Sequence, residues 1–151
     1  MLLFPNQISI NNNKNLKIRK LKLRQCVKMK IVIYNITQDK LIKQNIKFAD
    51  SYLKRLKGLM FKKNIDYGII LKVNNPKTKI KSSIHSFFML ITIKVYFVDE
   101  KKEIFEIARL KPWKSYTPKK KASYIIEFKE GQIKNNELKI GDKIDFVCEI
   151  N

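Results

Sequence analysis

The sequence has few of the residues that most catalytic and metal sites require. Among 151 residues it has one histidine, His85, and two cysteines, Cys26 and Cys148. One histidine excludes a multi-histidine metal site and leaves a single position for a Ser-His-Asp catalytic site. The cysteines fit neither a metal-binding spacing nor a disulfide framework. We therefore expect a reduced cytoplasmic protein that holds no metal ion or cofactor.

Long hydrophobic runs and nucleotide-binding glycine motifs are also missing. No apolar run approaches the roughly 18 residues of a membrane-spanning helix, and the start lacks a basic region followed by a long apolar stretch. We expect neither a membrane span nor secretion. The four glycines form no GxGxxG or GxxxxGK[ST] motif, and neither CxxC nor HExxH occurs. Catalysis is therefore the weaker interpretation, although the sequence does not settle whether the protein is an enzyme.

Acidic residues are scarce: 13 Asp and Glu face 33 Lys and Arg, which gives a net charge of +20. A surface of one sign attracts phosphate or other anions, so an anionic ligand or a nucleic acid is a candidate partner. The alternative is compositional bias, because 29 of the basic residues are lysine, and isoleucine and asparagine are also abundant. Readers of nucleic acid rely more on arginine.

The charge pattern divides the chain into two parts. Residues 1–28 carry seven basic residues and no acid, and we interpret them as a basic, flexible leader, with Met29 as an alternative start. Residues 29–151 have the length of one domain. We expect this single β-rich domain to be a monomer.

Short β-branched or alternating segments dominate residues 29–151. A helix is predicted over 52–57, because Asp50 and Ser51 can cap its start and Gly58 can end it. No second long helix provides parallel crossovers, so the strands are expected to pair in an antiparallel manner. The prediction is a mainly β (β-rich α+β) fold, a compact antiparallel barrel or sandwich of about eight strands with one short helix. The predicted strands are 31–36, 41–48, 68–73, 80–90, 93–99, 103–110, 123–128 and 144–150.

Two polar residues stand in apolar strands and are the candidate catalytic residues. His85 lies in Ile84-His85-Ser86-Phe87-Phe88-Met89, and Glu127 lies in Tyr124-Ile125-Ile126-Glu127-Phe128. A buried carboxylate must be paired or protonated, and the planar guanidinium of Arg55 suits such a pair. One alternative is that His85 is an interior side chain with its hydrogen bonds satisfied and no catalytic role. The other is that Arg55 and Glu127 are exposed to solvent on separate faces.

The segment from 111 to 121 combines five lysines with two aromatic rings and no acid. Rings that stack on bases and lysines that follow phosphates are typical of single-stranded nucleic-acid binding. A long surface loop anchored by its tryptophan would have the same composition. The candidate nucleic-acid-binding residues are Lys111, Trp113, Lys114, Tyr116, Lys119, Lys120 and Lys121.

Several short motifs occur in the order seen in one known family. They are Ala49-Asp50-Ser51 with Arg55, Gly58-Leu59-Met60-Phe61, Gly68, Ile84-His85-Ser86-Phe87-Phe88-Met89, Phe97-Val98-Asp99, Pro112-Trp113, Tyr124-Ile125-Ile126-Glu127 and Ile140-Gly141-Asp142. Over about residues 30–148 the chain resembles the domain of unknown function 192 family, most closely its archaeal branch. It departs from the family at Lys94, where aspartate is usual, and at Ser86, where threonine is usual.

The resemblance implies a small single-domain, mainly β protein without an assigned activity. It also implies that Arg55, Met60, His85, Phe88, Met89 and Glu127 gather near one cleft, to which we add Trp113 at the rim. The leading hypothesis is a binding module in which these residues hold a small anionic ligand or an acidic partner. The alternatives are nucleic-acid binding through the leader and the 111–121 segment, and a hydrolytic enzyme that uses His85.

Overall fold

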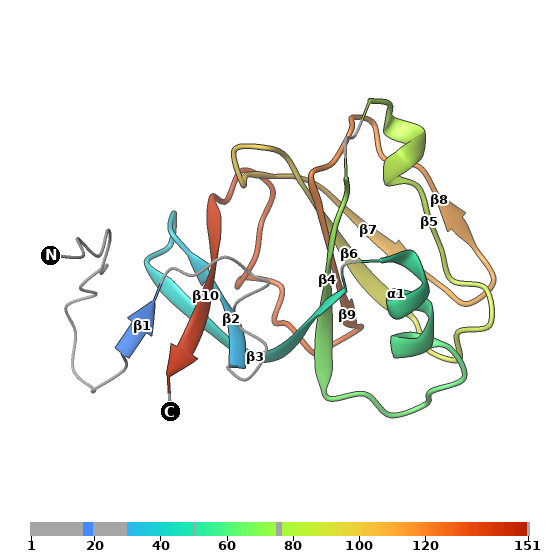
Figure 1. Cartoon of the computed structure of the whole chain (residues 1–151), viewed down its shortest axis with the longest axis horizontal. Helices are drawn as coiled ribbons and strands as arrows, with labels where there is room; N and C mark the ends of the chain where they lie inside the picture. The colour runs from blue at the N-terminus through green and yellow to red at the C-terminus, as the bar shows by residue number, and fades with distance from the viewer. Residues whose placement is uncertain (1–16, 20–29, 50, 75–76, 151) are drawn as a thin grey trace, which may run out of the picture.

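Strands dominate the computed structural model, which describes residues 17–19, 30–49, 51–74 and 77–150. Eight of them form one curled sheet in the order β1-β10-β2-β3-β4-β9-β6-β7, and β5 pairs with β8 beside it (Figure 1). The prediction of a compact, mainly β fold with one short helix is confirmed. The strands of the large sheet are β1 (Lys17–Arg19), β2 (Lys30–Asn35), β3 (Lys40–Ala49), β4 (Tyr67–Lys72), β6 (Ile93–Val98), β7 (Ile104–Leu110), β9 (Tyr124–Lys129) and β10 (Ile144–Ile150).

The helix α1 (Tyr52–Leu59) connects β3 to β4. The Ser51 hydroxyl accepts a hydrogen bond from the Lys54 N–H at 3.4 Å, which is the expected cap; Asp50 lies outside the described residues. Because the chain crosses over through this helix, β3 and β4 run parallel, with Ile46 opposite Gly68. This pair departs from the predicted antiparallel pairing, which the other recorded strand pairs follow.

Little of the basic leader belongs to the described structure. Within residues 1–28 only β1 is described, and it pairs antiparallel with β10. The rest of the leader lies outside the described residues, so its flexibility stays a prediction.

The predicted strand over 80–90 is the main error in the secondary structure. A 3-10 helix, η2 (Lys79–Ser82), is followed by the two-residue strand β5 (Ile84–His85) and then by an irregular loop; β5 pairs with β8 (Ser115–Tyr116). Two buried serines explain the break, because Ser82 and Ser86 bond to backbone groups of distant loops instead of alternating along a strand. The Ser82 hydroxyl, for example, accepts the Ala122 N–H at 2.8 Å.

Apolar side chains fill both faces of the central strands. In β6, Val95 and Phe97 pack on the face that α1, β5 and β8 cover, whereas Tyr96 and Val98 pack inside the curl. Gly68 of β4 allows Phe128 to lie flat across the inner face, since a Cβ there would lie 2.2 Å from the phenyl ring. A central strand buried on both faces produces the nearly continuous apolar sequence seen here.

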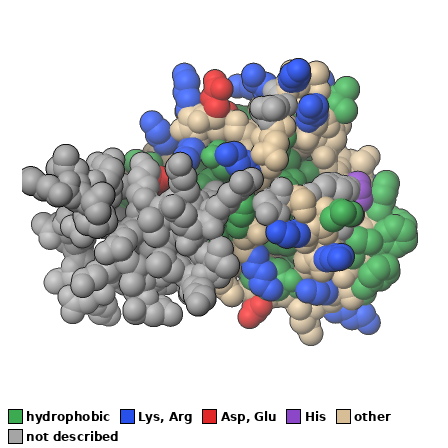
Figure 2. Space-filling model, in the orientation of Figure 1, with side chains coloured by type: hydrophobic (Ala, Val, Ile, Leu, Met, Phe, Trp, Pro, Cys, Tyr) green, Lys and Arg blue, Asp and Glu red, His purple; other side chains and the backbone are tan. Residues whose placement is uncertain are grey.

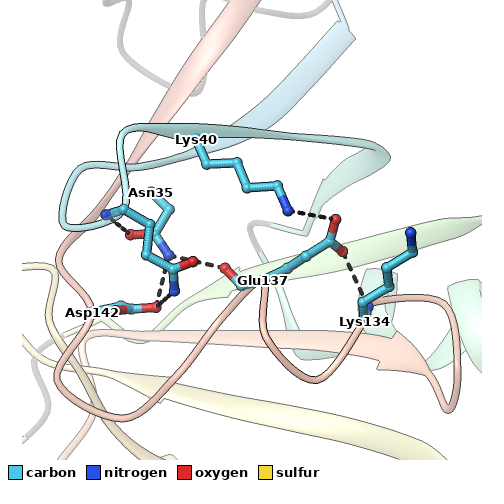
Figure 3. Close-up of polar contacts among 6 residues, drawn as sticks. Asn35, Lys40, Lys134, Glu137 and Asp142 are labelled. Carbon is cyan, nitrogen blue, oxygen red and sulfur yellow. Dashed lines mark hydrogen bonds and ion pairs between the residues drawn. The ribbon is translucent and has the colours of Figure 1, made fainter.

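A polar network around Asp142 links loops at one end of the curled sheet (Figure 3). The buried Asp142 carboxylate accepts hydrogen bonds from the side-chain amides of Asn35 at 2.7 Å and Gln38 at 2.6 Å, and from the Lys139 N–H at 2.8 Å. The Asn35 amide also donates to the Glu137 carbonyl at 2.9 Å. Nearby, the Ile104 N–H donates to the Asp142 carbonyl at 2.9 Å, which links the start of β7 to the approach to β10. The Ile140-Gly141-Asp142 motif therefore has a structural role.

Candidate recognition surface

Three of the predicted site residues lie together at the surface. The exposed rings of Phe88 and Trp113 meet edge to face, with centroids 4.8 Å apart. The half-buried His85 ring stacks on Phe87 at 4.6 Å, and Phe87 in turn lies 6.2 Å from Trp113. The predicted residues His85, Phe88 and Trp113 are therefore linked through rings.

Sequence reasoning missed two residues of this surface, Phe61 and Phe87. Phe61 follows the end of α1, is 67% exposed, and its centroid lies 5.7 Å from that of Phe88. Both residues belong to motifs that the sequence contains, but an apolar residue in a motif is normally assigned to the core. We define the aromatic cluster as Phe61, Phe87, Phe88 and Trp113. Figure 2 shows hydrophobic side chains gathered at one edge of the molecule, next to the histidine.

The other predicted site residues lie deeper. Met89 is fully buried, Met60 is half-buried, and Glu127 is 1% exposed on β9. Glu127 is paired in register with Ile69 and Val95, so it belongs to the face of the sheet covered by α1. The side chain of Arg55 lies outside the described residues, and the Arg55–Glu127 pair stays a prediction.

The backbone of the aromatic cluster is strained. Phe61, Phe88 and Trp113 have φ values of +58°, +61° and +62°. A bulky residue in this left-handed region is uncommon; each costs about 1–3 kcal/mol and persists only where its surroundings impose the conformation. Three such residues from three separate loops converge on one exposed surface.

Hydrogen bonds hold these loops in place. The Phe61 N–H donates to the Phe88 carbonyl at 2.9 Å, and the Trp113 N–H donates to the Ser86 carbonyl at 3.1 Å. The buried Ser86 hydroxyl donates to the Lys111 carbonyl at 2.6 Å and accepts the Lys114 N–H at 3.0 Å. The hydrogen bonds of Ser86 therefore hold the loop that carries Trp113 against the loop that carries Phe87 and Phe88.

Positive charge surrounds the rings. Lys62 and Lys63 follow Phe61, Lys111 and Lys114 flank Trp113, and all four are exposed. Lys62 Nζ donates to the Tyr67 hydroxyl at 3.0 Å, so we define the lysine border as Lys63, Lys111 and Lys114. The segments 51–65, 77–98 and 107–126, which supply the three loops, contain no Asp or Glu. The aromatic cluster is thus an apolar surface with a basic border, and it favours a partner that is apolar and negatively charged.

Comparison with known proteins agrees with the motif order. The family model for domain of unknown function 192, described as an uncharacterized conserved protein family, matches residues 33–146. The chain belongs to this family. A Thermococcus sibiricus UPF0127 protein is 38% identical over 118 residues, 78% of this chain and 76% of that protein. A Pyrococcus furiosus UPF0127 protein is 37% identical over 112 residues, 74% and 95% of the two chains.

Two crystal structures share the family's fold at low identity. A Sinorhizobium meliloti protein, described as a candidate transcription regulator, has a TM-score of 0.65 at 14% identity and covers 78% of this chain and 92% of its own. A protein of unknown function from Novosphingobium aromaticivorans has a TM-score of 0.62 at 18% identity, with 77% and 83% covered. Both likenesses concern the fold alone.

Lys94, where the resemblance implies aspartate, lies away from Glu127. Lys94 Nζ donates to Asn135 Oδ1 at 2.9 Å, and its register partner on β9 is Phe128, which packs inside the curl. Glu127 belongs to the opposite face of the sheet. Lys94 therefore does not share a face of the sheet with Glu127.

The 111–121 segment is only partly a free loop. Tyr116 belongs to β8, stacks on Phe97 at 5.7 Å, and donates a hydrogen bond to Glu106, which also accepts the Lys119 N–H at 2.8 Å. The bond to Glu106 raises the pKa of the Tyr116 hydroxyl. Trp113 is exposed, whereas Tyr116 anchors the segment; Lys111, Lys114, Lys119, Lys120 and Lys121 are exposed.

The described residues contain neither a cluster of metal-binding side chains nor a membrane-spanning helix. Within the described ranges, no three His, Cys, Asp or Glu side chains are grouped to hold a metal ion. The described part of the chain has no helix long and apolar enough to cross a membrane.

The His85 Nδ1 atom accepts a long hydrogen bond, 3.4 Å, from the Phe87 N–H. A hydrolytic role for His85 stays a prediction, and activity that survived His85→Ala would remove it.

Proposed function

We propose that the protein is a binding module that recognises an acidic partner through the aromatic cluster and its lysine border. The observation that carries the proposal is the convergence of three exposed aromatic residues at positive φ. Strain at functional sites persists where the surrounding structure imposes it. Rings held in place before binding lose little conformational freedom when a partner arrives, which favours affinity.

The residue types also support recognition rather than folding. Exposed aromatic side chains add little to core stability, but they are enriched among the residues that dominate binding energy. Lys63, Lys111 and Lys114 complement a negative partner and disfavour a positive one. The same surface could hold a small anion, which the test below includes.

Trp113 provides the test, because it is the single tryptophan of the chain and belongs to the aromatic cluster. Nucleotides, carboxylate metabolites and acidic peptides that contain phenylalanine would be screened by Trp113 emission and thermal denaturation. A true ligand at 100 times its dissociation constant adds about 2.7 kcal/mol to the free energy of unfolding. This gain should disappear in the Phe61→Ser, Phe88→Ser double variant.

A matched control removes an equally exposed apolar side chain elsewhere. Ile140, in the turn before β10, is 63% exposed, so Ile140→Ser should keep the ligand response. No response of the unmodified protein to any probe, or a response that survives loss of both phenylalanines, would contradict the proposal.

A second candidate function is single-stranded nucleic-acid binding, which the exposed Trp113 between Lys111 and Lys114 favours. Affinity for a labelled oligonucleotide should fall steeply between roughly 50 and 200 mM salt. Trp113→Ala should weaken it further, by about 1–3 kcal/mol for a stacked base. Tyr116→Phe is the control, because it removes only the hydroxyl that binds Glu106. Unchanged affinity in Trp113→Ala would remove this candidate.

A further inference from the structure

We propose that the partner of the aromatic cluster is the surface of an anionic lipid bilayer, an inference that rests on the proposed function. The protein would dock with its rings at the boundary between headgroups and acyl chains. The argument uses the position of the rings, the type of charge beside them and the way they pack.

The aromatic cluster lies on the tips of three neighbouring loops. Phe61 follows α1, Phe87 and Phe88 follow β5, and Trp113 lies between β7 and β8. Leu90, in the same loop as Phe88, is also exposed. Figure 2 shows hydrophobic side chains gathered at the outer edge of the molecule beside the histidine. Exposed apolar side chains at such an edge can enter a membrane surface together. Tryptophan is enriched at the membrane interface because it combines an apolar ring with a polar N–H, and phenylalanine and leucine add apolar area that can enter the acyl boundary.

The bordering charge is of the type that suits lipid headgroups. Lys63, Lys111 and Lys114 lie within two residues of Phe61 or Trp113 in the sequence and are exposed, so their apolar stems can extend beside the rings while the ammonium groups reach phosphates. Lysine acts as a hydrated point charge without a fixed binding geometry. A bilayer with diffuse negative charge needs no fixed geometry, whereas base or carboxylate recognition favours the fork of arginine.

The packing of the rings favours a bilayer over stacked bases. Trp113 meets Phe88 at an interplanar angle of 64°, and Phe88 meets Phe61 at 43°. Phe87 meets Trp113 at 34°, so the four rings do not form one flat platform for a run of stacked bases. Insertion of an apolar tip into a bilayer needs only exposed apolar area, which this arrangement provides.

Trp113 emission during a vesicle titration tests the inference on the whole chain. The vesicles would contain equal parts of phosphatidylcholine and phosphatidylglycerol, with pure phosphatidylcholine as the neutral comparison. We expect a blue shift with the anionic vesicles and quenching by lipids brominated on the acyl chains. Lys63→Gln with Lys114→Gln should weaken partitioning about 25-fold, from about fivefold (about 1 kcal/mol) per lysine near an anionic surface.

Variants at the rings separate insertion from charge attraction. Phe61→Ser with Phe88→Ser should weaken partitioning at least about tenfold, because two exposed phenyl rings leave the interface. Ile140→Ser, and Lys101→Gln with Lys139→Gln, remove exposed residues of the same kinds elsewhere and should change partitioning little. Urea denaturation of every variant would show whether it is folded.

Each result has a definite meaning. Vesicle binding without a Trp113 shift, or with equal affinity in the double phenylalanine variant, would overturn the inference in favour of charge attraction alone. If vesicles do not bind at low salt while an acidic peptide or metabolite shifts Trp113, the lipid inference fails and the proposed function stands. If neither vesicles nor those probes shift Trp113, both fail.

Discussion

Replacing Ser86 with alanine tests whether one buried hydroxyl organises the aromatic cluster. The Ser86 hydroxyl is fully buried, donates to the Lys111 carbonyl and accepts the Lys114 N–H. These contacts fix the two ends of the turn that carries Trp113. Alanine would leave the shape of the loop nearly unchanged while removing both bonds.

The expected cost follows from the two groups that lose a partner. A hydrogen bond contributes about 0.5–1.5 kcal/mol net, and a buried group left unsatisfied costs about 1–3 kcal/mol. Both backbone groups are only partly buried, so water can compensate for part of the loss. We expect Ser86→Ala to lower the free energy of unfolding by about 2 kcal/mol. Because Trp113 has a strained φ that these bonds help to impose, its ring should also become more mobile.

The assay combines urea denaturation with acrylamide quenching and anisotropy of Trp113. Ser83→Ala is the matched control, because the Ser83 hydroxyl binds only the Thr117 hydroxyl, at 2.9 Å, in an exposed setting. This control should cost no more than about 0.5 kcal/mol. Equal costs for the two variants would refute the reasoning on stability. A loss of stability without greater mobility of Trp113 would refute the link between Ser86 and the aromatic cluster.

Two further substitutions test the core. Gly68→Ala places a Cβ 2.2 Å from the Phe128 ring and should lower the free energy of unfolding, measured in urea, by about 1–3 kcal/mol. The control Gly58→Ala places a Cβ 2.7 Å from the flexible end of the Ile69 side chain and should lower it less. A larger loss in Gly58→Ala than in Gly68→Ala would contradict the packing argument. The Tyr96 hydroxyl is buried and bonds to no described residue, so Tyr96→Phe should leave stability at neutral pH unchanged or raise it. Burial, with a smaller effect of Glu137, raises the pKa of Tyr96 from 10.0 to about 12. An unfolded tyrosine loses its proton first, so Tyr96 makes stability fall between pH 10.0 and about 12, by up to about 1.4 kcal/mol per pH unit. Tyr96→Phe should remove this part of the fall and leave the part due to Tyr116, whose pKa is also raised. A stability difference between the two proteins that stays constant with pH would rule out this account.

The elements with a clear local signal were predictable. The strands predicted over 93–99 and 144–150 and the Ser51 cap depend on neighbouring residues, and the structure has them as β6, β10 and the start of α1. The structure of segment 80–90 was not predictable, because its apolar run has no periodicity that distinguishes a strand from a packed loop. Its course is set by Ser82 and Ser86, which bond to groups 40 and 28 residues away in the sequence.

The candidate site was partly predictable for a related reason. His85, Phe88 and Trp113 stood out as residues of unusual type in motifs, and they lie at one surface. Phe61 and Phe87 did not stand out, because nothing in the sequence indicates that a non-glycine residue has a positive φ or that a phenylalanine is exposed. The backbone of the surrounding loops decides both properties. Met89 and Glu127 belong to the buried layer beneath α1.

The family motifs separate into those that build the domain and those that the domain presents. Gly68 and Asp142 are explained by close packing and by satisfied polar groups. The aromatic cluster has no such explanation, because rings exposed by 39% to 67% contribute little to a core, and three of them carry backbone strain. Ser86 connects the two kinds of motif, since its buried hydroxyl is part of the fold and its effect is to fix the exposed tryptophan loop. Stability and recognition should therefore respond to different substitutions, and a variant that removes the rings but keeps Ser86 should remain folded and lose its partner.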